Sequence, residues 1–112
     1  MRAPHPIDHP LYQLLHNEKI KEFNEQRKNH HPVDLSGGDF RGADLRGIEV
    51  DGVSFADAYF RGADLRGIDF RRTNLEGASL AHAQISGTYF PKELSAEEVL
   101  MSVNHGTRLR YR

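Results

Sequence analysis

The nine-residue stretch FRGADLRGI at residues 40–48 recurs without a change at residues 60–68, an offset of twenty. A shorter period of five lies inside it, because every fifth residue from Leu35 onward is apolar. These twelve positions, called the centres below, are Leu35, Phe40, Leu45, Val50, Phe55, Phe60, Leu65, Phe70, Leu75, Leu80, Ile85 and Phe90. The residue two places before each centre is small or β-branched. Such self-similarity indicates a repeat architecture.

A period of five fits neither an α-helix, at 3.6 residues per turn, nor an uninterrupted strand, at two. It fits three extended residues followed by a corner. Strand side chains alternate, so each centre and the residue two before it point inward. Eight of the ten glycines occupy the corner position, where a positive φ costs glycine nothing. Four such sides make one coil, and residues twenty apart are predicted to stack at about 4.8 Å.

The pentads Ala43–Gly47 and Ala63–Gly67 follow the pattern A-(D/N)-L-x-G and resemble the pentapeptide-repeat family. The resemblance extends from Val33 to Lys92. It implies an all-β solenoid, a right-handed quadrilateral parallel β-helix. Twelve pentads give about three coils, with a height of about 14 Å.

The resemblance divides the chain into three parts. Residues 1–32 are predicted to form an N-terminal leader and helical cap, and residues 33–92 the β-helix. Residues 93–112 are predicted to form a C-terminal capping helix and a strand-like tail. The ends of a solenoid expose apolar coils, so both flanks are expected to be α-helical caps.

The N-terminal flank changes its apolar phase partway. Leu11, Leu14 and Leu15 form one helical stripe, whereas Ile20 and Phe23 fall on another face. This pattern predicts two short helices within residues 10–29, with Asn17 as the N-cap of the second.

The C-terminal flank contains a capping box at residues 95–98, which predicts a helix running to about His105 and stopping at Gly106. Val99, Leu100 and Val103 are predicted to close the last coil.

The residues after this helix alternate, with three arginines on one side and Leu109 and Tyr111 on the other. A closed monomer offers no obvious place for this pattern, and Met101 falls off the apolar stripe of the helix. The sequence therefore predicts a homodimer through the C-terminal region, with Met101, Leu109 and Tyr111 as its contacts.

The composition excludes several classes of function. Fifteen Lys and Arg residues against sixteen Asp and Glu give a net charge of −1, which argues against direct binding of nucleic acid. The absence of cysteine excludes disulfides and thiol catalysis. No apolar run approaches the roughly 18 residues of a membrane span, and the first residues lack the apolar segment of a secretory signal. A cytoplasmic protein without a membrane partner is expected.

No motif for catalysis or a cofactor is present. The chain lacks a phosphate-binding loop, an H-E-x-x-H motif and a G-x-S-x-G motif. Ser79, His82 and Ser86 lie near one another on the third coil and are interpreted as outward polar decoration. The histidines fall in the leader and linker, where His5, Asp8, His9, His30 and His31 lack the fixed geometry of a metal site. We expect no enzymatic activity, no metal, no cofactor and no small-molecule substrate.

Arginines form two outward columns on adjacent walls of the predicted solenoid. They are Arg41 above Arg61 and Arg46 above Arg66. These four residues are candidate contacts for an anion or an acidic partner, although Asp44 and Asp64 interleave with them.

Two classes of function follow from the resemblance. The best-known activity in the family is protection of type II topoisomerases such as gyrase, by acidic solenoids that resemble duplex DNA. Residues 33–92 carry nine acidic and seven basic side chains, whereas about 14 Å of DNA presents about eight negative charges. The sequence therefore favours a non-enzymatic structural or protein-interaction module of unknown biological role. A gyrase-binding DNA mimic is the alternative.

Overall fold

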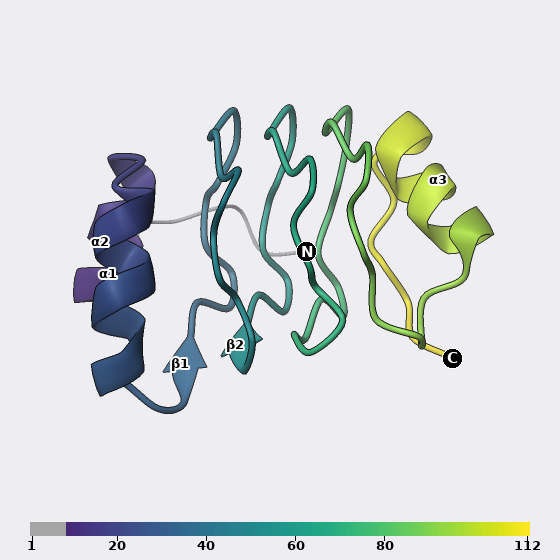
Figure 1. Ribbon diagram of the computed structural model, residues 1–112. Helices are drawn as coiled ribbons and strands as arrows, with labels where there is room; N and C mark the ends of the chain where they lie inside the picture. Colours follow the sequence, from purple (N-terminus) through teal and green to yellow (C-terminus); the bar gives the residue numbers. More distant parts are fainter. Residues whose placement is uncertain (1–8) are drawn as a thin grey trace.

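The computed structural model describes residues 9–112. Its elements are the helices α1 (Pro10–His16) and α2 (Ile20–Gln26), the 3₁₀ helix η1 (Arg27–Asn29), the strands β1 (Val33–Asp34) and β2 (Val53–Ser54), and the helix α3 (Ala96–His105). Irregular coils stack along one axis between the helices (Figure 1), with α1 and α2 at one end and α3 at the other.

The coils are joined by parallel pairing at a constant step of twenty residues. β1 pairs with β2 in parallel, with Val33 opposite Val53. Six further parallel bridges keep the same step: Asp39 with Tyr59, Asp44 with Asp64, Ser54 with Asn74, Tyr59 with Ser79, Asp64 with Gln84, and Asp69 with Tyr89. We call residues 33–52, 53–72 and 73–92 the first, second and third coils. Parallel pairing of successive coils in one direction is a β-helix.

The centres lie inside the coils. Those from Leu35 to Leu80 are buried, whereas Ile85 and Phe90 of the third coil are partly buried. Phe40 and Phe60, twenty residues apart, stack with ring centroids 5.4 Å apart and an interplanar angle of 16°. Aromatic pairs of this kind add about 0.5–1.5 kcal/mol beyond their buried area.

The corners require a left-handed backbone. Gly42 and Gly62, which stand twenty residues apart, have φ of 70° and 67°. Asp57 and His82 take the same conformation without glycine, at φ of 58° and 56°.

The junction of the two N-terminal helices differs from the sequence prediction. Asn17 is the C-cap of α1, where its backbone N–H donates to carbonyls of the last turn. The N-cap of α2 is Lys19, whose side chain forms no capping hydrogen bond. The prediction of Asn17 as an N-cap is wrong because Glu18 turns left-handed, at φ of 57°, and delays the start of α2.

α3 begins and ends where its capping residues predict. The Ser95 hydroxyl accepts a hydrogen bond from the Glu98 N–H at 3.1 Å, and Gly106 ends the helix with φ of 72°. Its inward face, however, consists of Glu98, Val99 and Ser102. Leu100 is 52% exposed, so its placement in the inward stripe is wrong. The third coil presents backbone N–H groups to this helix, and a hydroxyl meets them better than a leucine does.

Candidate interaction surface

Polar side chains cap the N-terminal end of the first coil. The Tyr12 hydroxyl donates to the Asp39 carbonyl at 3.2 Å, and the Glu18 carboxylate accepts from the Asp44 N–H at 2.7 Å. These groups stand where a preceding coil would place its backbone, so the ladder ends without unpaired groups at these positions.

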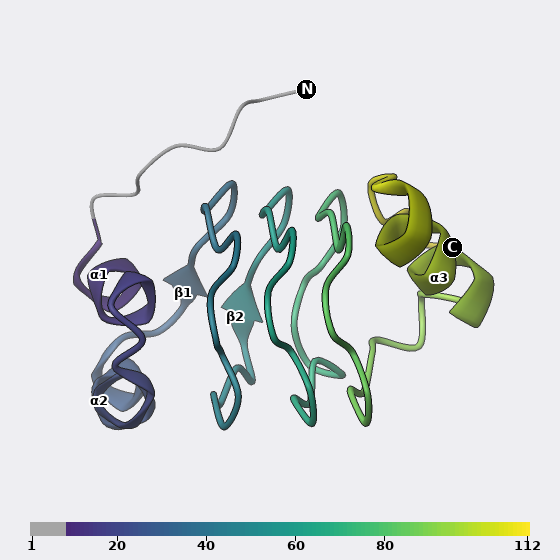
Figure 2. The same cartoon turned by 90° about the horizontal axis from the view of Figure 1, so that it is seen from above.

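Asn24 on α2 caps two backbone groups at once. Its amide nitrogen donates to the Gly47 carbonyl at 3.0 Å, and its amide oxygen accepts from the Glu49 N–H at 2.8 Å. Arg27 donates to the Asp51 carbonyl. Because α1 and α2 lie side by side (Figure 2), helices cover both halves of this end.

At the opposite end, α3 caps one side of the third coil. The Ser102 hydroxyl accepts from the Leu80 N–H at 2.9 Å, and the Val103 carbonyl accepts from the His82 N–H at 2.8 Å. Ser102 is completely buried, as a capping hydroxyl between a helix and a coil should be.

The tail, residues 107–112, caps the neighbouring side. The Leu109 carbonyl accepts from the Gly77 N–H at 2.7 Å, and the Leu109 N–H donates to the Ala78 carbonyl at 2.8 Å. The Tyr111 hydroxyl accepts from the Leu75 N–H at 2.8 Å.

This arrangement corrects the predicted dimer contacts. Leu109 is 1% exposed, and Tyr111 is partly buried against the core. Both therefore pack within one chain, because the edge of the third coil supplies the pairing partner that the sequence did not reveal. Of the three predicted contacts, only Met101 is exposed, at 49%.

The remaining half of the third coil is uncapped. In the second coil, the Leu65 N–H donates to the Gln84 carbonyl at 2.9 Å. The equivalent N–H groups of Ile85, Gly87 and Phe90 form no hydrogen bond within residues 9–112. No helix lies over this half (Figure 2).

Exposed apolar side chains gather near the same end. The large hydrophobic side chains most exposed in the described chain are Tyr89 at 55%, Leu100 at 52% and Met101 at 49%. The C-terminal end therefore combines unpaired backbone donors with apolar surface, a combination absent from the N-terminal end.

The walls carry a motif that the sequence analysis missed. Four aspartates accept two hydrogen bonds from the guanidinium two residues later and one from its backbone N–H: Asp39–Arg41, Asp44–Arg46, Asp64–Arg66 and Asp69–Arg71. The D-x-R spacing was the available signal. Three candidate anion contacts, Arg41, Arg46 and Arg66, are thus already paired, whereas Arg61 forms no ion pair within the described residues.

Asp64 is the most strongly paired of these aspartates. Its carboxylate lies 2.7 Å from the Arg66 guanidinium and 3.3 Å from that of Arg46 in the preceding coil. Hydrogen bonds from Arg66 are the main cause that lowers the pKa of Asp64 to about 2.

The low pKa predicts a loss of stability in acid. An unfolded aspartate has a pKa of about 3.9, so the ionised Asp64 stabilises the fold above about pH 4 and ceases to do so as the pH falls toward 2. Asp64→Asn should lower the melting temperature at pH 7, and the difference from the native chain should vanish near pH 2. Glu25→Gln, at an exposed carboxylate without an ion pair in the described chain, is the control. A difference that persists unchanged at pH 2 would contradict the assignment.

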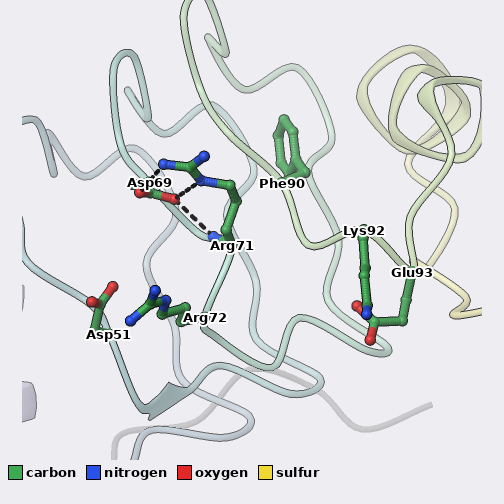
Figure 3. A pocket seen from close by; sticks show the side chains of 7 residues that line it. All are labelled: Asp51, Asp69, Arg71, Arg72, Phe90, Lys92 and Glu93. Atoms are coloured by element: carbon green, nitrogen blue, oxygen red, sulfur yellow. Dashed lines mark hydrogen bonds and ion pairs between the residues drawn. The ribbon is translucent and has the colours of Figure 1, made fainter.

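A shallow hollow lies beside the uncapped half (Figure 3). Its volume is about 660 Å³, and it is lined by Asp51, Asp69, Arg71, Arg72, Phe90, Lys92 and Glu93. The Arg71 guanidinium pairs with Asp69 and lies 4.7 Å from the centroid of the Tyr89 ring. Three cations face three carboxylates, so the hollow selects neither anions nor cations.

The polar residues considered for catalysis and metal binding have ordinary environments. The Ser79 hydroxyl donates to the Gly106 carbonyl at 3.4 Å, and the side chain of His82 is exposed. The part of the chain that the structure describes contains no group of three or more His, Cys, Asp or Glu residues arranged for a metal. His5 and Asp8 lie outside that part. Within residues 9–112, no helix has the length and apolar character needed to cross a bilayer.

Comparison with known proteins agrees with this architecture. Residues 54–90 match the family described as pentapeptide repeats, in eight copies. The chain is thus a pentapeptide-repeat protein, and the repeats account for its β-helix. No curated protein and no solved structure gives a significant match.

Proposed function

We propose that this protein is a non-enzymatic protein-interaction module that forms a homodimer through its C-terminal end. In this proposal the repeats form a right-handed quadrilateral β-helix of about three coils, held between helical caps. The observation that carries the proposal is the unequal capping of the two ends. Side chains of α2 meet the backbone of the first coil on the half that corresponds to the uncapped half of the third.

The uncapped half has the physical properties of an interface. Unpaired backbone groups at a sheet edge favour pairing or coverage by another chain. The partly buried Ile85 and Phe90 and the exposed Leu100 and Met101 add apolar area, which contributes about 25 cal/mol per Å² when it is removed from water.

No observation favours a DNA mimic. Such a protein needs a continuous negative surface, whereas four wall aspartates are paired with arginines at 2.7–2.8 Å. The remaining carboxylates alternate with Arg61, Arg72 and Lys92.

The dimer predicts a mass that depends on concentration. Light scattering of the full chain should rise from 12.7 kDa toward twice that value as concentration increases. Arg61→Glu, on a wall remote from both ends, should leave this behaviour unchanged. A mass of one chain at every concentration, up to the solubility limit, would refute the dimer.

A further inference from the structure

The C-terminal end face has two levels. Over residues 75–82 of the third coil it is raised, because the tail and α3 lie on that half. Over residues 83–92 it is recessed, and no helix or strand lies beyond the coil there (Figure 2). We call these the raised half and the recessed half.

A second feature is the outer face of α3. Glu97, Leu100, Met101 and Asn104 follow the i, i+3, i+4, i+7 spacing of one helical face, and all four are exposed. This face, called the outer stripe, lies opposite the buried Glu98, Val99 and Ser102. It consists of two adjacent apolar side chains with a hydrogen-bond acceptor on each side.

We propose that the outer stripe of each copy covers the recessed half of a second copy in a two-fold symmetric dimer. This inference rests on the proposed homodimer and specifies its geometry. A two-fold interface uses the same patch on both subunits. An axis along the boundary between the two halves lays each raised half on the partner's recessed half. An axis that sets raised half against raised half would leave both recessed halves open.

The chemistry of the two surfaces matches. Leu100 and Met101 of one copy cover the partly buried Ile85 and Phe90 of the other. The Glu97 carboxylate and the Asn104 amide then supply acceptors for unpaired N–H groups of the recessed half. Asn24 already does this at the N-terminal end, where its amide meets the first coil.

The geometry fits a helix laid over a coil. α3 covers its own coil through Ser102 and the Val103 carbonyl, so the distance between coil and helix suits contacts made by side chains. A second helix over the recessed half would complete the coverage that α1 and α2 give the first coil (Figure 2). Each dimer would then contain two third coils, each covered by one helix of its own and one of its partner.

The double variant Leu100→Glu/Met101→Glu tests the outer stripe. Both side chains are exposed in the monomer, so the fold should survive, as melting of dilute samples will verify. The dimer Kd should rise on the order of 100-fold, as expected when the central apolar contacts of an interface are lost. His105→Ala, also exposed on α3 but off the stripe, is the matched control. Unchanged dimerisation of the double variant would overturn the inference.

An isotope-mixed sample identifies the contact directly. With one copy labelled and the other unlabelled, we expect nuclear Overhauser effects between the methyl groups of Leu100 and those of Ile85 in the other copy. A doubled mass without these cross-copy effects would reject the arrangement and leave the homodimer standing. A single-chain mass at all concentrations would reject the homodimer itself.

Discussion

Replacing Phe60 with alanine is expected to lower the free energy of unfolding by about 3–5 kcal/mol. Phe60 is fully buried in the second coil. Its ring stacks on Phe40 at 5.4 Å and meets Phe55 edge-on at 5.5 Å. The neighbouring coils hold each other at the spacing of the ladder, so they cannot collapse into the space the ring leaves. The cost should therefore be near the upper end of this range.

Chemical denaturation of Phe60→Ala measures this effect. Phe90→Ala is the matched comparison, because Phe90 ends its column and is only partly buried. It should cost clearly less. Equal losses for the two variants would contradict a core built from columns that end at the third coil.

Deletion of residues 107–112 is the second change with a large expected effect. It exposes the site of Leu109, whose buried side chain alone is worth about 2–5 kcal/mol. It also leaves the N–H groups of Leu75 and Gly77 without acceptors, and each such loss costs about 1–3 kcal/mol if the group stays buried. Arg108 adds to the effect, since it donates to the Gly77 carbonyl at 2.7 Å and to the Tyr59 hydroxyl at 2.8 Å.

The melting temperature of the shortened chain should fall sharply at every protein concentration. Thr107→Ala keeps the backbone of the tail and should behave like the native chain. A shortened chain that melts normally and is merely monomeric would show that the tail serves association, as the sequence first indicated, and not the closure of the third coil.

The repeat section could be predicted because one period fixes both the local shape and the packing. A small residue, a large centre and a corner glycine recur so regularly that the stacking of Phe40 on Phe60 follows from arithmetic. The ends of α3 were predictable for a similar reason, since the contacts of Ser95 and the left-handed turn at Gly106 are local.

The caps could not be predicted in the same way, because their partners are distant in sequence. Asn24 meets residues 23 and 25 positions away, and Ser102 meets Leu80 across 22 positions. Hydrophobic patterning selected Leu100 for the inward face of α3, but the coil edge required hydrogen-bond acceptors. Tyr111 was misplaced for the same reason, since its hydroxyl caps a backbone N–H.

The candidate interface was predicted only at its position in the chain. The sequence pointed to the C-terminal region and to Met101, which is exposed. It did not indicate that coverage of the third coil stops at residue 82, because every pentad of that coil has a regular pattern. The recessed half becomes visible only when the hydrogen bonds of each coil edge are compared.

Scalar couplings across hydrogen bonds test the central claim most directly. In the β-helix, the Leu45 amide nitrogen should couple to the carbonyl carbon of Asp64, and the Leu65 nitrogen to that of Gln84. Couplings between these residues, at separations of nineteen positions, require successive coils to pair in parallel. Detection of both in a dilute, monomeric sample is the result we predict. Their absence, with these amides coupled instead to carbonyls four residues earlier as in a helix, would contradict the β-helix and everything inferred from its ends.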